Sequence, residues 1–183
     1  FSLPKLCELS AFRYLCANME ADDTTGIKAE PYQIFDVEGL KLGVIGAIQI
    51  NHRGTPDAHP DVLRGLKFSS PFEAVSRHEW LSRQCDATIL LSHVGYREDL
   101  VIAKQNPWLD AIIGGHSHRQ LSEEEPLHDG VLVTQNRNLL GSAVHVTLTV
   151  HSGHVISKKT DYILVRSFPR PNKVAEMMVQ TFM

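Results

Sequence analysis

The alternation of apolar and polar residues along the chain predicts several β-strands. Residues 32–37 alternate, Glu38–Gly39 form a turn, and residues 40–46 return, which is typical of a β-hairpin. The short apolar runs at 87–91 and 109–113 are bounded by polar residues and predict two buried strands. These runs mark the positions where a sheet is expected to form.

Other segments follow a helical or loop-like pattern. Helices are expected over residues 3–12, 71–84, 98–105 and 174–182, and further strands over 13–17, 131–134, 143–150 and 155–165. The stretch 51–67, with its prolines and glycines, predicts a long surface loop, and 122–129 an acidic one. Strands that alternate with helices, closed by an antiparallel hairpin, predict an α/β fold with a mixed sheet and helices packed outside it.

Composition narrows the class of protein. The 183 residues fit one domain, 1–183, and with a net charge of -3 no overall positive field points to a nucleic-acid polymer as partner. The apolar runs are shorter than the ~20 residues that a membrane-spanning helix needs. Cys7, Cys16 and Cys85 lack the spacing of a zinc ribbon, and a Cys7–Cys16 disulfide is possible on number alone. We expect free, mostly packed thiols.

Three histidines leave the ends of two expected strands. His93 follows the first buried run and precedes Val94–Gly95, and His116 and His118 follow Gly114–Gly115 after the second. Ligands of α/β sheets bind beyond the carboxyl ends of strands, and glycine lets the backbone approach an ion closely. Imidazole binds zinc, iron, nickel or manganese. The pattern predicts one wall of a metal site, while the remaining seven histidines are expected to be solvated or packed.

Other catalytic patterns are weaker. The chain contains no nucleophile elbow, Walker loop or dinucleotide-binding fingerprint. Ser92 and Ser117 each neighbour a histidine, but adjacency along a chain does not give the hydrogen-bond geometry of a catalytic triad. Asp86 and Asp110 precede the buried runs and are expected to be caps or turn residues, and Asp99 is expected to serve a helix N-terminus. Metal-assisted hydrolysis is therefore favoured.

The segments 92–96 (SHVGY), 114–118 (GGHSH) and 34–46 resemble the calcineurin-like metallophosphoesterases, most of all the 5'-nucleotidase and 2',3'-cyclic-nucleotide phosphodiesterase branch. The resemblance implies an αββα sandwich with mixed sheets and two divalent metal ions (zinc, manganese, iron, cobalt or magnesium). His93 and His116 would bind one ion and His118 the other. Such a pair holds a hydroxide that attacks the phosphorus of a nucleotide or another small phosphoester.

The resemblance also places several functional blocks before Phe1. The family's Asp-x-His, Gly-Asp and Gly-Asn-His-Glu blocks are expected there, including the catalytic histidine. We therefore expect 1–183 to be the later part of a catalytic domain, incomplete at the N-terminus and inactive without that segment. Relatives imply a periplasmic, extracellular or cell-surface location. A thiosulfohydrolase-like sulfur-ester hydrolase and a non-catalytic metal- or ligand-binding module remain as alternatives.

Overall fold

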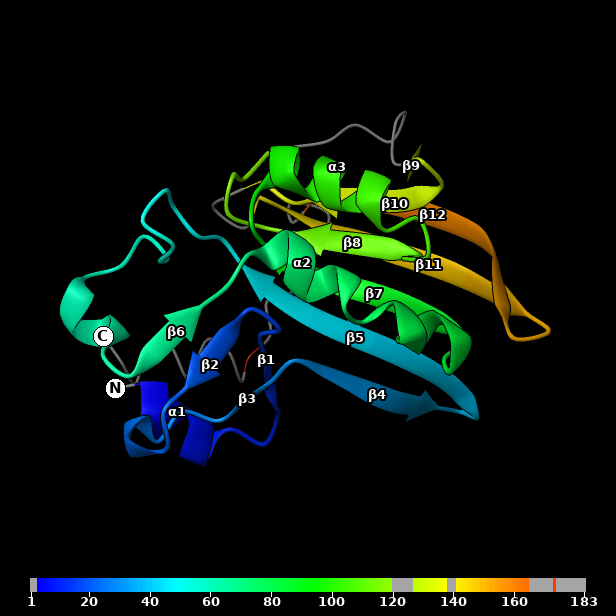
Figure 1. The fold of residues 1–183 in the computed structure, drawn as a ribbon. Coiled ribbons are helices and arrows are strands. Elements are labelled where there is room, and N and C mark those ends of the chain that lie inside the picture. Colours follow the sequence, from blue (N-terminus) through cyan, green and yellow to red (C-terminus); the bar gives the residue numbers. More distant parts are fainter. Residues whose placement is uncertain (1–2, 120–126, 138–140, 165–172, 174–183) are drawn as a thin grey trace.

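A six-stranded mixed sheet forms the centre of the computed structural model, which describes residues 3–119, 127–137, 141–164 and 173 (Figure 1). Its strands, in spatial order, are β4 (Tyr32–Val37), β5 (Leu40–Ile48), β7 (Ala87–His93), β8 (Ala111–Gly114), β10 (Val131–Gln135) and β9 (Leu127–His128). The four inner strands run parallel, and β4 and β9 add antiparallel edges. The arrangement confirms the predicted α/β class with a mixed sheet.

The first hairpin forms as the sequence predicts. Val37 pairs with Leu40, so only Glu38 and Gly39 make the turn, with φ of 54° and 88°. Two positive φ angles in a two-residue loop match the twist of the flanking strands, and glycine adopts such a φ without strain. The Asp36 carboxylate accepts a hydrogen bond from the Gly39 N–H at 2.9 Å. Local sequence therefore fixes the register of β4 on β5.

Two helices, α2 (Pro71–Ser76) and α3 (Tyr96–Gln105), cover one face of the sheet (Figure 1). The apolar core lies under this helical layer and includes Ile45, Leu90, Ile102, Ile112 and Val133. Within this layer the side chains interdigitate, and the fully buried aliphatic residues supply the hydrophobic stabilisation of the fold.

The prediction of one helix over 71–84 is wrong. The chain forms α2, ends it near Arg77, and continues as a 3-10 helix, η3 (Glu79–Arg83). The His78 ring lies 2.8 Å from the carbonyl oxygen of Ala74, which an uninterrupted helix would pair with the His78 N–H. That N–H donates to Val75 instead, so the side chain competes with the helical backbone.

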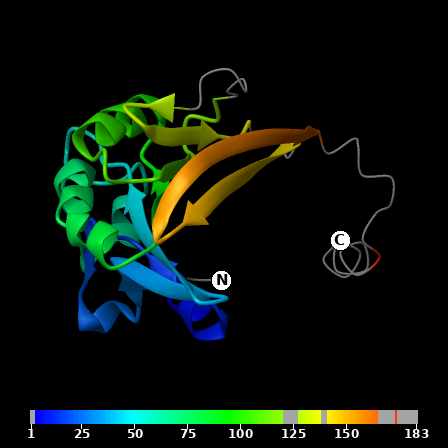
Figure 2. The same cartoon turned by 90° about the vertical axis from the view of Figure 1, so that its right-hand side faces the viewer.

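The second hairpin, β11 (Ser142–His151) and β12 (His154–Leu164), lies on the other side of the sheet (Figure 2). Lys158 of β12 contacts the Asp110 carboxylate at 3.2 Å and donates to the carbonyl of Gly130. Thr134 and Tyr162 share a hydrogen bond of 3.2 Å between their hydroxyls. These contacts attach the hairpin to the β8–β10 side of the sheet. The antiparallel hairpin that the sequence predicts in this part of the chain is confirmed.

The rest of that face is open in the described part of the chain. Leu91 is 43% exposed and Phe35 40% exposed, and Ile89 is only partly buried. The expectation that 87–91 is buried throughout is therefore wrong, because its residues alternate between the helical layer and this open face. An apolar run alone does not show how many layers cover it.

The N-terminal segment packs beside β5. It contains α1 (Leu3–Leu9), β1 (Tyr14–Leu15), β2 (Met19–Ala21), η1 (Asp23–Thr25) and β3 (Ala29–Glu30). The chain after β5 forms η2 (Pro60–Leu63) and β6 (Leu66–Phe68), and β6 pairs with β2. The first helix ends before residue 12, and the expected loop 51–67 carries η2 and most of β6. The buried Asn18 amide donates to the carbonyls of Ile48 and Ser69, which joins the end of β5 to the start of α2.

The expected helix 174–182 and residues 122–126 of the acidic loop lie outside the described residues. None of the described helices is long and apolar enough to cross a bilayer.

Candidate metal centre

The structure brings His93 and His116 together. His93 is the last residue of β7, and His116 follows the last residue of the adjacent parallel strand β8 by two positions. The two ring centroids lie 5.2 Å apart at an interplanar angle of 71°. His118 is exposed and lies near enough for its charge to act on His93. The three predicted imidazoles therefore lie in one region at the carboxyl end of the sheet.

His93 is held in the neutral form that binds metals. Partial burial lowers the pKa of its imidazole, and the charges of His116 and His118 lower that pKa further. A lower pKa keeps the ring unprotonated at neutral pH, which leaves a nitrogen lone pair available as a ligand.

The backbone of the His116 loop has an uncommon conformation. His116 has a φ of 70° and His118 a φ of 48°, both in the left-handed region that non-glycine residues seldom adopt. Each such residue costs of order 1 kcal/mol or more and persists only where its surroundings hold it in place. Clustered strain of this kind is typical of functional sites.

Gln135, at the end of β10, holds that loop. Its side chain is 1% exposed, and its Oε1 accepts hydrogen bonds from the Ser117 hydroxyl at 2.8 Å and the Arg119 N–H at 2.6 Å. Its Nε2 donates to the carbonyl of Gly115. One buried amide thus satisfies three groups of the loop. The sequence analysis missed Gln135, although a polar residue that ends an otherwise apolar strand is a usable signal.

Glycine is required where the two loops meet. A Cβ on Gly115 would lie 3.0 Å from Nδ1 of His93, closer than ordinary van der Waals contact. Gly95, with a φ of 108°, is the N-cap of α3, and a Cβ there would approach both Glu98 and the His116 ring. The glycines that the sequence places beside each histidine therefore make room for the opposite loop.

Asp99 lies in the first turn of α3, as expected of an acidic residue at a helix N-terminus. Its side chain is 0% exposed, and its carboxyl accepts a hydrogen bond from the Ser92 hydroxyl at 2.5 Å, a contact that the sequence did not predict. Burial raises the pKa of Asp99, the Ser92 hydrogen bond opposes this and the Glu98 charge adds to it, so that the pKa is raised to about 7. Asp99 thus lies directly below the His93 loop.

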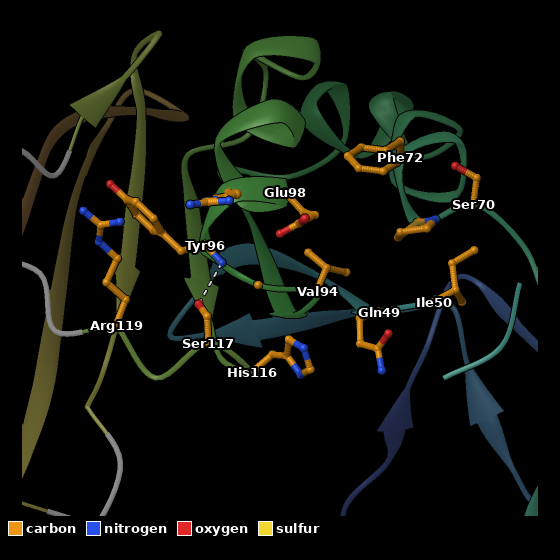
Figure 3. Close-up of a pocket in the computed structure, with 13 residues that line it drawn as sticks. Gln49, Ile50, Ser70, Phe72, Val94, Tyr96, Glu98, His116, Ser117 and Arg119 are labelled. Atoms are coloured by element: carbon orange, nitrogen blue, oxygen red, sulfur yellow. Dashed lines mark hydrogen bonds between the residues drawn. The ribbon is translucent and has the colours of Figure 1, made fainter. Parts of the chain in front are cut away.

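A cavity of about 660 Å³ opens beside His116 (Figure 3). The segment after β5 and the first residues of α2 and α3 line it, with Phe72 and Glu98 among them. Tyr96 N–H donates to the Ser117 hydroxyl at 3.0 Å, and the Arg119 guanidinium lies 4.6 Å from the centre of the Tyr96 ring. The volume lies in the range that small-molecule sites occupy, and the lining offers aromatic, cationic and acidic groups.

The donor set present fits part of a metal site. Among residues 3–119, 127–137, 141–164 and 173, no three histidine, cysteine, aspartate or glutamate side chains gather closely enough to hold an ion. The His93–His116 pair, with one imidazole kept neutral, is suited to divalent metals as an incomplete ligand set.

One Asp-x-His triplet does occur within the chain, at Asp57–Ala58–His59, and the sequence analysis passed over it. Its side chains are exposed and serve their own loop. The Asp57 carboxylate accepts from the Asn51 amide at 3.0 Å, and the His59 ring accepts from the N–H of Asp61 at the start of η2. The spacing of the triplet is therefore explained by loop structure.

The remaining candidates have structural roles. Asp86 accepts from the N–H of Lys41 at 2.6 Å and Asp110 from that of Thr88 at 2.9 Å, as expected of turn residues. The cysteines of the described region, Cys7, Cys16 and Cys85, are free thiols, as predicted.

Sequence comparisons identify the family of the chain. The model of the family described as calcineurin-like phosphoesterase matches residues 10–120. A 5'-nucleotidase of Vibrio cholerae is 30% identical over 135 residues, 65% of this chain and 24% of the relative. A 5'-nucleotidase of Diplobatis ommata is 28% identical over 162 residues, 84% of this chain and 27% of the relative. The chain thus spans about a quarter of the length of these curated relatives.

Structural comparisons give the same fold. A sulfate thiohydrolase of Thermus thermophilus superposes with a TM-score of 0.81 at 21% identity, covering 97% of this chain and 33% of that one. A 5'-nucleotidase precursor of Thermus thermophilus superposes with a TM-score of 0.72 at 25% identity, covering 88% of this chain and 35% of that one. Because the family model matches more than half of the residues, the chain belongs to the calcineurin-like phosphoesterase family.

Proposed function

We propose that this chain contributes to a metal-dependent phosphoester hydrolase of the 5'-nucleotidase type, which acts on a nucleotide phosphate. The observation that carries the proposal is the His93–His116 pair at the ends of two adjacent parallel strands, next to a cavity of about 660 Å³. Similarity to 5'-nucleotidases over 65% of the chain supports the choice of substrate class.

Each imidazole has an assigned part in this proposal. His93 and His116 would hold one divalent ion, and His118 the second. When bound, two such ions supply an activated hydroxide and neutralise charge on the phosphoryl oxygens. Gln135 keeps the His116 loop in its left-handed conformation, and Arg119 offers a cation at the rim of the cavity.

The remaining ligands are proposed to come from a segment that precedes Phe1. The resemblance to the family supports this proposal, because the family's bridging aspartate and catalytic histidine belong to Gly-Asp and Gly-Asn-His-Glu blocks that do not occur in residues 1–183. The residues 1–183 are then expected to bind metal weakly and to show no turnover by themselves. On the same resemblance, we propose a periplasmic or cell-surface location for the whole protein.

Metal titration tests the site directly. Zinc and manganese are titrated into the chain by isothermal calorimetry, alongside His116→Ala and the control His145→Ala, whose ring is exposed on β11. Loss of one ligand should lower affinity by about tenfold or more, and the control should match the parent. Equal affinities for the parent and His116→Ala would contradict the assignment.

An activity assay tests the reaction. Phosphate release from AMP is measured with manganese or zinc, for residues 1–183 and for a chain extended upstream through its own coding sequence. Turnover is expected from the extended chain alone. Turnover by 1–183 would refute the division of ligands, whereas metal binding without any turnover by the extended chain would indicate a binding module.

A further inference from the structure

A buried carboxyl lies below the two histidine loops, with one oxygen paired and the other not. Asp99 Oδ1 accepts from the Ser92 hydroxyl, while its Oδ2 has no hydrogen-bond partner among the described residues. A buried polar atom without a partner destabilises the folded state, and such atoms are uncommon in native proteins. Packing stability alone would favour an apolar residue at this position of α3, so the carboxyl needs another explanation.

The paired oxygen acts on the His93 loop. Ser92 immediately precedes His93, and its hydroxyl oxygen accepts a hydrogen bond from the Val94 N–H at 3.2 Å while it donates to Asp99. The bond to Asp99 therefore fixes the direction of the Ser92 hydroxyl. That hydroxyl thus holds the Val94 N–H, and the backbone on both sides of His93 is kept in a tight turn.

The unpaired oxygen lies against the other loop. A Cβ built on Gly114 would lie only 2.5 Å from Asp99 Oδ2, 3.2 Å from the carbonyl oxygen of Thr134 and 3.3 Å from Nε2 of Gln135. Asp99 and Gln135 thus close around the same glycine, from which the chain continues to His116. Only a residue without a side chain fits between them.

From these contacts we infer that Asp99 is a positioning residue, which sets the placement of His93 relative to His116 by contacting the backbone of both loops from the helical side of the sheet. It acts through Ser92 and Gly114. A raised pKa of about 7 is consistent with this position, since it reflects the same burial. A residue with only a packing role would instead affect global stability.

Hydrogen exchange measured by NMR tests the inference without any metal. The variants are Asp99→Ala, the near-isosteric Asp99→Asn and the control Thr160→Val. The control removes the Thr160 hydroxyl on β12, which is the other buried side-chain polar atom without a partner in the described region. Exchange of the Val94 N–H should accelerate about tenfold or more in Asp99→Ala and stay near the parent rate in the other two variants. Exchange in the core of β5 should not change.

Two results of that experiment would overturn the inference. One is a Val94 exchange rate in Asp99→Ala that equals the parent rate. The other is a uniform acceleration of all amides, which would show a global role only. Should Asp99→Ala fail to fold, Ser92→Ala removes the same link and is expected to accelerate exchange at Val94 selectively.

Zinc affinity supplies a second readout, which rests on the proposed function. Removal of a residue that orients a metal ligand typically lowers affinity 10–100-fold, and we expect this range for Asp99→Ala, with recovery in Asp99→Asn. Unchanged zinc affinity in a folded Asp99→Ala would refute the positioning role. If the parent binds no zinc, the proposed function fails, while the exchange experiment still decides the role of Asp99.

Discussion

Asp99→Asn should change how the stability of the chain depends on pH. The folded state raises the pKa of the Asp99 carboxyl from 3.8 to about 7. Between those values the folded protein holds a proton that the unfolded chain releases. The free energy of unfolding therefore falls as pH rises from about 4 to about 7, and it levels off above that range.

The size of the effect follows from the two pKa values. Each pH unit between them corresponds to roughly 1.4 kcal/mol, so the interval from 3.8 to about 7 corresponds to about 4 kcal/mol. Asparagine has nearly the same shape and does not ionise. The difference in stability between the parent and Asp99→Asn should thus shift in favour of the variant by about 4 kcal/mol between pH 4 and pH 8.

Urea unfolding followed by circular dichroism, at half-unit steps from pH 4 to pH 8, measures this difference. The lowered pKa of His93 works in the opposite direction, since stability from that group rises with pH up to about 6.5, but it is present in both proteins and cancels. Parallel curves for the two proteins over the whole range would refute the assignment of a buried, protonated Asp99.

Three further outcomes are expected. Gly46→Ala places a Cβ 2.1 Å from the backbone oxygen of Leu15, so β1 must move. Thermal melting should show that the free energy of unfolding falls by about 1–3 kcal/mol. The control Gly141→Ala, whose Cβ meets no described atom within 4 Å, should melt like the parent. Gln135→Leu should accelerate amide exchange in the 115–119 loop and weaken zinc binding about tenfold or more. A change in stability without either effect would contradict the role of Gln135 in holding that loop. Zinc affinity measured by calorimetry should decline as pH falls below 6.5, where protons compete for the His93 ring; a flat profile between pH 7 and pH 5 would argue against an imidazole ligand.

Local sequence predicted the parts of the fold that local chemistry controls. The turn at Glu38–Gly39 and the histidines that follow two apolar runs were visible because strand periodicity and glycine placement are encoded over a few residues. The single helix over 71–84 was a local prediction too. It failed because the His78 ring, and not its N–H, pairs with the Ala74 carbonyl.

The support of the site could not be predicted in this way. Gln135 lies 16 to 20 residues from the loop groups that it binds, and Asp99 reaches back across a strand end to Ser92. Such contacts depend on which strands become neighbours in the sheet, and no pattern in a single sequence specifies that order. The open face beside Leu91 is likewise a property of how layers stack, which an apolar run does not reveal.

Ser92 and His93 are consecutive residues of β7, and the pleat of the strand turns their side chains to opposite faces. Adjacent positions of the strand therefore contribute to two different faces, one with the candidate ligand and one with the helical layer that supports it. Substitutions on the histidine side can retune ligand preference without repacking the aliphatic interior, and helix-side changes can adjust rigidity without removing a donor atom. The residues of the proposed site can in this way vary while the packed framework beneath them stays the same.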